Sequence, residues 1–346
     1  MGEISEAFIW YGDWAEEVSP LYASLARKAA QCPNLVDIAA EARDGQPPPQ
    51  LLLAAVHALV LEEPDHRIAE FYPSCTDDPL DPSDADPFPA FREFCLTHEG
   101  RVREIVATRR VQTNDVGRSA VLFPAFAHAA RTGVRRPLAL VEVGTSAGLN
   151  LYWDRFQYAY DEYGTHGESS SPVRIESAVK GAIDPPLSAS IPDVEYRAGI
   201  DLQPLDVTDP SDKRWLRALA IPDQQWRYDR LAAAIELVAD DPPRLVEGDV
   251  PSVLPDLLPE VPVELELCIF STHTLYQFEE SAVAEFENVL REFSRERPLY
   301  WFSDTSSSES EYPNYRMVTL RDGVSEETHL AEYKSYGEWI RWLAAE

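Results

Sequence analysis

The sequence predicts an α/β protein in which a doubly wound sheet, extended by a terminal antiparallel hairpin, follows an α-helical N-terminal domain. Three observations support this prediction. Apolar residues recur with helical spacing up to about residue 135. After that point, short apolar strands alternate with helices, as in a parallel sheet that helices cover on both faces. The segment YRMVTL, the turn RDG and the segment VSEETHLAEY then predict the hairpin, which is expected to add an antiparallel strand to the edge of the sheet.

The helical domain is expected over residues 1–135. Prolines mark the start of two of its helices, SPLYASLARKAA and PPPQLLLAAVHALVLEE. A further helical stretch is expected in FPAFREFCLTHEGRVREIVATRR. The proline-rich segment FYPSCTDDPLDPSDADPFP predicts one long loop between these helices. We expect this domain to form a lid over the substrate.

Five apolar strands are expected in the second domain, residues 136–346. In chain order they are PLALVEVG, VEYRAGIDL, PRLVEGD, VELELCIFS and PLYWFSD. An insertion near residues 155–181 alternates with a period of two and predicts a β-ribbon. Five parallel strands followed by a hairpin are the Rossmann-like layout of class I S-adenosylmethionine-dependent methyltransferases.

The charge balance limits the possible partners. The chain has 60 acidic and 30 basic residues, a net charge of −30, and only four of the bases are lysines. Such a surface repels nucleic acids and anionic membranes, so we expect neither as a partner. Concentrated salt screens the self-repulsion of so many carboxylates, which favours a halophilic cytoplasm. The alternative is an acidic protein of a mesophile.

The sequence predicts neither a membrane span nor a metal site. Its longest apolar run, residues 51–61, is much shorter than the ~20 residues that a bilayer requires. The acidic beginning MGEISEAFIWYGDWAEE is unlike a signal peptide, so a cytoplasmic protein is expected. The four cysteines lack C-x-x-C spacing, so we expect neither a disulfide framework nor a zinc site.

The segment LVEVGTSAGLN predicts a cofactor-binding turn between the first strand and a helix. Glycines let a cofactor approach the backbone, and a helix N-terminus offers free N–H groups. The spacing is not the G-x-G-x-x-G of dinucleotide sites. The turn alone would equally suit tight packing of a strand on a helix. The candidate cofactor-binding residues here are Glu142, Gly144, Ser146, Gly148 and Asn150.

Acidic residues end the next two strands. Asp201 is placed to accept hydrogen bonds from ribose hydroxyls, and Asp249 is placed to reach an adenine amine. Each is alternatively a helix N-cap or a loop residue. The order Glu142, Asp201, Asp249 along successive strands favours a cofactor site. Glu142 and Asp201 are 59 residues apart, and the β-ribbon accounts for most of this interval. If the ribbon belongs to the sheet, Asp201 loses its assigned role.

Polar residues also follow the fourth and fifth strands. Ser271, His273 and Tyr276 lie at the carboxyl edge, where open α/β sheets bind ligands. His273 is a candidate general base, but a positioning or structural role is the alternative. Asp304, after the fifth strand, has the same ambiguity.

The segment ATRRVQTNDVGRSAVLFPA gathers polar and cationic side chains just before the helix that leads into the first strand. Gln112 and Arg118 are candidates for binding the carboxylate of the cofactor or an anionic substrate. The alternative is a turn that connects the domains and is held by side-chain hydrogen bonds.

The chain resembles the family catalogued as domain of unknown function 2332. The resemblance rests on the stretches DPFPAFREFC, ATRRVQTNDVGRSAVLFPA, LALVEVGTSAGLNLYWDRFQYAY, GIDLQPLDVTDP, RWLRAL and PPRLVEGD. They extend from about residue 50 to residue 300. The resemblance implies a methyltransferase-like fold without an assigned substrate.

These observations predict a cytoplasmic S-adenosylmethionine-dependent methyltransferase that acts on a small molecule. Methyl transfer is an in-line displacement, so the protein has to align two reactants and needs neither a metal nor a covalent nucleophile. The alternative is a non-catalytic ligand sensor or scaffold with the same fold. The glycine spacing and the terminal hairpin disfavour a third hypothesis, an NAD-dependent oxidoreductase.

Overall fold

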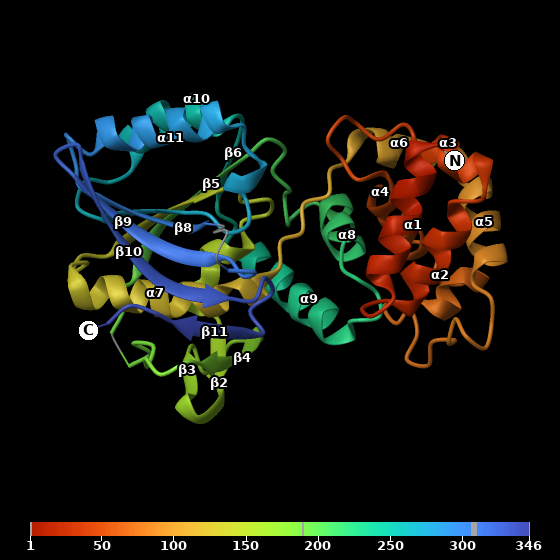
Figure 1. The fold of residues 1–346 in the computed structure, drawn as a ribbon, viewed down its shortest axis with the longest axis horizontal. Helices are drawn as coiled ribbons and strands as arrows, with labels where there is room; N and C mark the ends of the chain where they lie inside the picture. Colours follow the sequence, from red (N-terminus) through yellow and green to blue (C-terminus); the bar gives the residue numbers. More distant parts are fainter. Residues whose placement is uncertain (1, 189, 306–309, 346) are drawn as a thin grey trace. The chain divides into compact units, whose positions relative to one another are not determined.

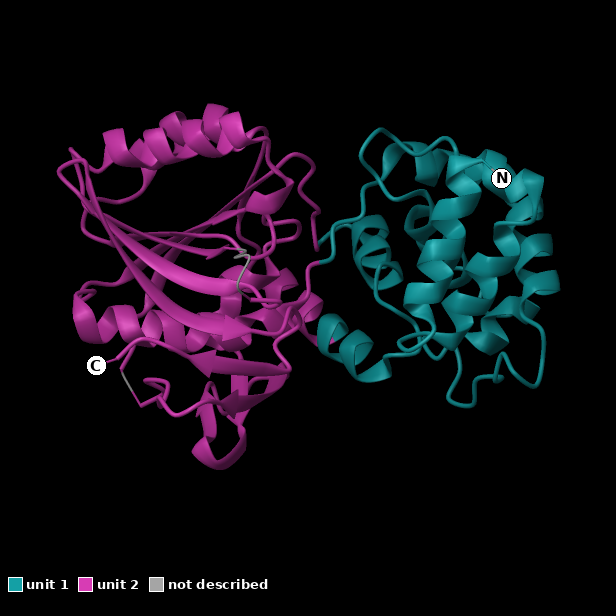
Figure 2. Ribbon diagram, in the orientation of Figure 1, with its two compact units in different colours: residues 1–113, 208–232 teal, residues 114–207, 233–346 magenta. Residues whose placement is uncertain are grey.

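The computed structural model describes residues 2–188, 190–305 and 310–345 and has two compact units (Figure 2). Unit 1 comprises residues 1–113 and 208–232, and unit 2 comprises residues 114–207 and 233–346. This division differs from the predicted boundary at residue 135. The helix expected to end the N-terminal domain, α7 (Ser119–Thr132), belongs to unit 2, and unit 1 includes α8 (Pro210–Ala218).

Side-chain contacts explain why α8 joins unit 1. The indole of Trp215 is buried and donates a hydrogen bond to the carbonyl of Arg110 at 3.0 Å. The guanidinium of Arg109 donates to the hydroxyl of Ser211 at 2.8 Å. These partners lie about a hundred residues apart in the chain, so local sequence patterns do not report the contacts.

Unit 1 is helical, as the sequence predicts. The stretch expected as one helical element around residues 88–110 is two helices, broken at His98. Ser19 caps a helix that starts at Pro20, because its hydroxyl accepts a hydrogen bond from the amide of Tyr22 at 3.1 Å. Besides α8, the helices are α1 (Glu3–Ala15), α2 (Pro20–Ala29), α3 (Pro33–Ala39), α4 (Pro48–Val60), α5 (Phe88–Thr97), α6 (Glu99–Thr108) and the start of α9 (Gln225–Ala239).

Unit 2 contains the five predicted strands, which are confirmed as a parallel sheet. They are β1 (Leu138–Val143), β5 (Val194–Asp201), β6 (Arg244–Glu247), β7 (Glu266–Phe270) and β8 (Leu299–Thr305). Their spatial order is β6-β5-β1-β7-β8. The chain therefore runs outward from β1 to β6 and then returns to β7, so the strand order reverses between β1 and β7. Open α/β sheets bind ligands at such a switch point.

The predicted terminal hairpin is confirmed as β9 (Asn314–Arg321) and β10 (Val324–Tyr333), which pair antiparallel. Its expected position at the edge of the sheet is wrong. β9 pairs with β8, and β10 pairs with an unpredicted strand, β11 (Trp339–Trp342). The hairpin therefore lies inside a sheet of eleven strands.

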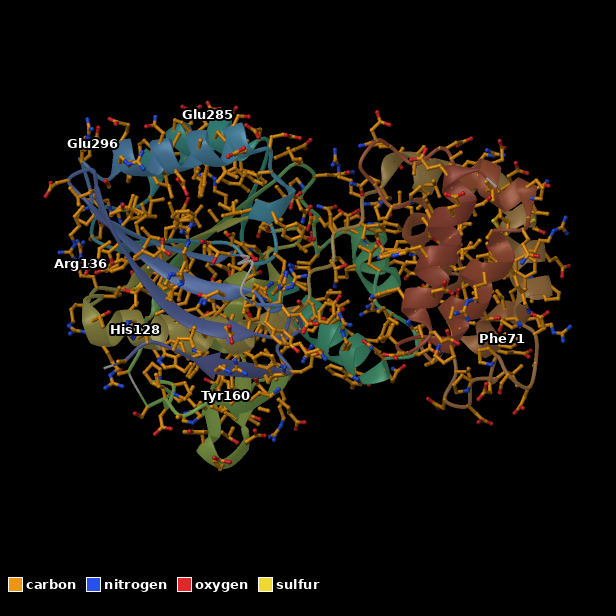
Figure 3. All side chains as sticks on the ribbon, viewed as in Figure 1. Phe71, His128, Arg136, Tyr160, Glu285 and Glu296 are labelled. Atoms are coloured by element: carbon orange, nitrogen blue, oxygen red, sulfur yellow. The ribbon has the colours of Figure 1, made fainter. Side chains whose placement is uncertain are left out.

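The predicted insertion forms β2 (Gln157–Tyr160), β3 (Gly164–Gly167) and β4 (Arg174–Lys180). It extends the sheet through the parallel pairing of β4 with β11. Tyr160, labelled in Figure 3, donates a hydrogen bond to the carbonyl of Ala120 at 2.8 Å, which holds β2 against α7. The insertion is thus part of the sheet, but at its far end. β5 still pairs directly with β1, so Asp201 does not lose its assigned role through the position of the ribbon in the sheet.

Helices cover both faces of the sheet (Figure 1). On one face, α10 (Val250–Leu257) and α11 (Glu280–Phe293) share an apolar core with β1, β5, β7, β8 and β9. On the other face, Phe126 of α7 stacks on Phe302 of β8, with ring centroids 4.5 Å apart. Because apolar layers enclose the sheet, polar side chains are left to gather at the carboxyl ends of its strands.

Candidate functional site

The turn after β1 requires glycine at two positions. Gly144 and Gly148 have φ angles of 71° and 73°, a region that disfavours other residues. A Cβ at Gly144 would collide with the side chain of Thr274, which follows β7, and a Cβ at Gly148 would lie 2.8 Å from Cγ of Pro243. Ser146 between them also has a positive φ, 52°. The backbone of this turn is therefore closely approached from two directions.

The prediction of a helix after this turn is wrong. The segment is a short 3₁₀ element, η3 (Leu149–Arg155), with a kink at Tyr152. The amide of Leu149 donates to Oδ1 of Asn114 at 3.0 Å, and Oδ1 of Asn150 accepts from the hydroxyl of Ser119 at 3.0 Å. A distant segment therefore holds the polar groups here, and the expected helix N-terminus does not form.

Asp201 faces the turn, as the sequence predicts. Its Oδ2 accepts a hydrogen bond from the amide of Ser146 at 2.8 Å, and its Oδ1 accepts one from the amide of Gln203 at 2.9 Å. The carbonyl of Ser146 accepts a further bond from the amide of Leu205 at 3.0 Å. These bonds join the carboxyl ends of β1 and β5 in one network. We call Gly144, Ser146, Gly148 and Asp201 the turn site.

Glu142 lies beneath the turn in the sheet and is only 1% exposed. Burial raises the pKa of its carboxyl group to about 8, although a 2.8 Å hydrogen bond from the hydroxyl of Thr145 and the nearby charge of Arg118 oppose the increase. The group is therefore largely protonated at neutral pH. In that state Glu142 does not neutralise the charge of Arg118.

Asp249 is exposed and occupies the N-cap position of α10. Its Oδ2 accepts a hydrogen bond from the hydroxyl of Ser252 at 3.1 Å. Asp249 therefore lies in the environment that the alternative interpretation predicts, the N-terminus of a helix. Asp249 follows β6, the strand that pairs with β5, and the adenine contact stays a prediction.

The two candidates for binding a carboxylate belong to different units. Gln112 is in unit 1, whereas Arg118 is in unit 2 and ends the short 3₁₀ element η2 (Val116–Arg118). Nη1 of Arg118 donates to the carbonyl of Thr272, after β7, at 3.4 Å. Burial raises the pKa of Asp304, as it does that of Glu142, and the charge of Arg118 opposes both increases. Arg118 thus lies where the strand order reverses.

His273 is held in an unusual backbone conformation. Its φ is 52°, and its amide donates to Oδ1 of Asp304 at 2.8 Å. Burial, reinforced by the charge of Arg118, lowers the pKa of its imidazole to about 3. His273 is therefore neutral at physiological pH, which favours a positioning role over that of a general base. Tyr276 is 71% exposed, and Ser271 is fully buried.

Sequence reasoning missed two tyrosines. Tyr315 of β9 and Tyr333 of β10 are fully buried, with ring centroids 6.0 Å apart, and the ring of His273 lies 5.6 Å from Tyr333. In the sequence they follow the alternation of ordinary core residues. Together with three half-buried side chains, the buried ones form what we call the switch-point cluster: Arg118, Ser271, His273, Asp304, Tyr315 and Tyr333.

The described residues set limits on the chemistry. Within the described ranges, we find no group of three or more His, Cys, Asp or Glu side chains that could hold a metal ion. No helix of the described chain is long and apolar enough to cross a membrane. The turn site offers the carboxylate of Asp201, because the amides of Gly144, Ser146 and Gly148 already donate hydrogen bonds within the protein. The switch-point cluster offers one cation, the carboxyl group of Asp304 and several hydroxyl groups.

Comparison with known proteins identifies a matching family. The model of a family described as "Uncharacterized protein conserved in bacteria (DUF2332)" matches residues 5–342, nearly the whole chain. No curated protein and no solved structure matches the chain.

Proposed function

The chain belongs to the DUF2332 family, and we propose that it is an S-adenosylmethionine-dependent methyltransferase for a small-molecule acceptor. The observation that supports this proposal most strongly is the bond between Asp201 and the amide of Ser146. It joins an acid at the end of β5 to a glycine turn at the end of β1, and open α/β sheets bind nucleoside cofactors with a glycine turn and a strand-end acid.

The fit of such a cofactor to the turn site rests on Asp201, because Thr274 and Pro243 occupy the space beside Gly144 and Gly148. Asp201 already accepts two amide hydrogen bonds, but its carboxylate has about four acceptor sites, so it can also accept ribose hydroxyls. In this proposal Asp249 reaches the adenine amine. Glu142 and Asn150 support the turn from beneath.

S-adenosylmethionine supplies a methyl group on a sulfonium sulfur. The task of the protein is then to align this group with the acceptor and to exclude water. The buried switch-point cluster beside β1 is the natural place for the acceptor. The strongly negative charge of the chain, −30, favours a small molecule over a nucleic acid.

Ligand binding tests this proposal directly. We would measure the melting temperature in molar KCl with S-adenosylmethionine, S-adenosylhomocysteine and NAD. A ligand at about 100 times its dissociation constant stabilises the folded state by about 2.7 kcal/mol. Stabilisation by the first two ligands alone supports the proposal, whereas stabilisation by none of them refutes it. Binding without transfer to any acceptor would favour a ligand sensor or scaffold.

A second candidate function is hydrolysis by a nucleophilic serine. Residues 144–148 read G-x-S-x-G, and the positive φ of Ser146, 52°, is the strain expected of a nucleophile on a strand-to-helix turn. The segment that follows is η3 rather than an α-helix, which disfavours this candidate. Labelling by a fluorophosphonate probe that Ser146→Ala abolishes would establish the hydrolase and overturn the methyltransferase proposal.

A further inference from the structure

The switch-point cluster contains buried polar atoms whose bonding capacity the described part of the chain leaves unused. Among the described residues, no hydrogen-bond partner is found for Nε of Arg118, Oγ of Ser271, Nε2 of His273 or the hydroxyls of Tyr315 and Tyr333. Ser271 and both tyrosines are fully buried. Leaving such groups unpaired is costly, so their concentration in one place points to a ligand.

Several contacts show that the groups other than Ser271 share one site, and Ser271 precedes His273 by two residues. Asp304 and Tyr315 face each other in the pairing of β8 with β9. The rings of His273 and Tyr333 contact each other edge to face. The positive charge of Arg118 acts on His273, Asp304 and Tyr333. The cluster therefore combines one cation with several hydroxyl groups at the ends of β7 to β10.

The unpartnered atoms in this cluster include several donors. The Nε–H of Arg118 and the hydroxyls of Ser271, Tyr315 and Tyr333 can each donate a hydrogen bond. A ligand with several oxygen lone pairs can accept from these groups. A carboxylate has two such oxygens and a negative charge, and a guanidinium is the side chain best suited to bind it.

We propose that the switch-point cluster binds the carboxylate of the methyl acceptor, so that the substrates are small carboxylic acids and the products are their methyl esters. This inference rests on the proposed function. In the reaction, a carboxylate oxygen forms a bond to the methyl carbon while the bond from that carbon to sulfur breaks. The electron pair stays on sulfur, which becomes a neutral thioether, and no proton moves.

The protonation states around the cluster agree with this assignment. An alcohol or an amine acceptor would have to lose a proton, and His273, with its pKa lowered to about 3, is a weak base. Burial raises the pKa values of Tyr315 and Tyr333 well above their usual range, so both stay neutral donors. A carboxylate arrives already deprotonated and needs no base.

Titration calorimetry of the full chain tests the inference with sodium benzoate and acetate as probes, benzamide as the uncharged isostere, and inorganic phosphate. We expect a carboxylate to bind at least tenfold more tightly than benzamide. Tyr333→Phe and Arg118→Gln should each weaken that binding roughly tenfold or more, as the loss of a hydrogen bond to a charged group requires. Tyr72→Phe is the matched control, because Tyr72 is also fully buried with an unpartnered hydroxyl among the described residues, but belongs to unit 1.

The outcomes separate this inference from the proposed function. Binding of neither carboxylate, equal binding of benzamide, tighter binding of phosphate, or equal losses in Tyr72→Phe would each overturn the carboxylate site. S-adenosylhomocysteine is titrated separately. If it binds while the carboxylates do not, the cofactor proposal stands alone. If the carboxylates bind and S-adenosylhomocysteine does not, the anion site stands and the methyltransferase proposal fails.

Discussion

The carboxylate of Asp201 accepts a hydrogen bond from the amide of Ser146 at 2.8 Å, across 55 residues of sequence. The bond joins the ends of two neighbouring parallel strands, β1 and β5. It fixes the turn in which Gly144 and Gly148 adopt positive φ angles. Asp201 therefore combines a structural role with the proposed contact to ribose, and the two roles can be separated experimentally.

We predict that Asp201→Ala loses both stability and affinity for S-adenosylhomocysteine. The loss of a carboxylate that accepts two amides should cost about 1–2 kcal/mol of unfolding free energy, as for a helix cap. The loss of charged hydrogen bonds to ribose should weaken binding roughly tenfold to a hundredfold. Chemical denaturation and titration calorimetry measure the two effects on the same protein.

Asp209→Ala is the matched control for this experiment. Oδ1 of Asp209 also accepts hydrogen bonds from two amides, those of Ser211 and Asp212, at 2.8 and 3.1 Å. Asp209 belongs to unit 1 and is exposed. It should lose a similar amount of stability and keep full affinity. If Asp201→Ala behaves in the same way, Asp201 is a structural residue only.

A second prediction concerns Gly144→Ala. The new methyl group would meet the side chain of Thr274, and the residue would keep a φ of 71°, so both packing and backbone conformation oppose it. Gly45→Ala isolates the backbone contribution, because Gly45 has a φ of 77° with no atom within 4 Å of the added Cβ. We expect Gly45→Ala to cost about 1 kcal/mol and Gly144→Ala to cost more. Similar melting temperatures would contradict the close packing of this turn.

The sequence predicted the elements that depend on local pattern. Apolar runs such as residues 138–143 and 266–270 identified the parallel strands and their chain order. The wrong predictions depend on distant contacts. Leu149 begins a short 3₁₀ element in place of the predicted α-helix, and its amide donates to Asn114, 35 residues earlier in the chain. Likewise, the sheet continues from β11 into β4 because residues 339–341 pair with residues 178–180, which no local pattern reports.

The same distinction between local patterns and distant contacts applies to the residues of the candidate site. Gly144 and Asp201 were found because glycine turns and strand-end acids leave local signals, and Asp201 does face the turn. Tyr315 and Tyr333 were missed because buried tyrosines in strands resemble core residues in sequence. Their importance comes from hydroxyls that lack partners among the described residues, a property that only the folded chain reveals.

A third prediction follows from the raised pKa of Glu142. Its carboxyl titrates near 4.5 in a model peptide and at about 8 in the folded chain. The folded chain binds the proton of Glu142 more tightly than the unfolded chain does. This bound proton stabilises the folded state fully below about pH 4.5, and the stabilisation is lost as the pH rises through 8. Glu142→Gln stays neutral at every pH. We therefore expect the unfolding free energy of the wild type to fall relative to this variant between pH 5 and pH 8, by at most about 1.4 kcal/mol per pH unit.

Glu260→Gln provides the control for this pH series. Glu260 is exposed, and its hydrogen bond from Arg244 lowers the pKa of its carboxyl, so the group is ionised in both the folded and the unfolded chain over this range. Its difference from the wild type should not change between pH 5 and pH 8. If the unfolding free energies of Glu142→Gln and the wild type also differ by a constant amount between pH 5 and pH 8, Glu142 is already ionised in the folded protein.

The last prediction concerns salt. With a net charge of −30, the chain repels itself over roughly 10 Å at about 0.1 M salt but over only about 3 Å at about 1 M. We expect the melting temperature and the circular dichroism signal of the folded chain to fall when the protein is moved from molar KCl to low salt. Sodium chloride at the same ionic strength should restore both, because screening does not depend on the identity of the cation. Melting temperatures that stay constant across this range would contradict adaptation to a halophilic cytoplasm and favour an acidic protein of a mesophile.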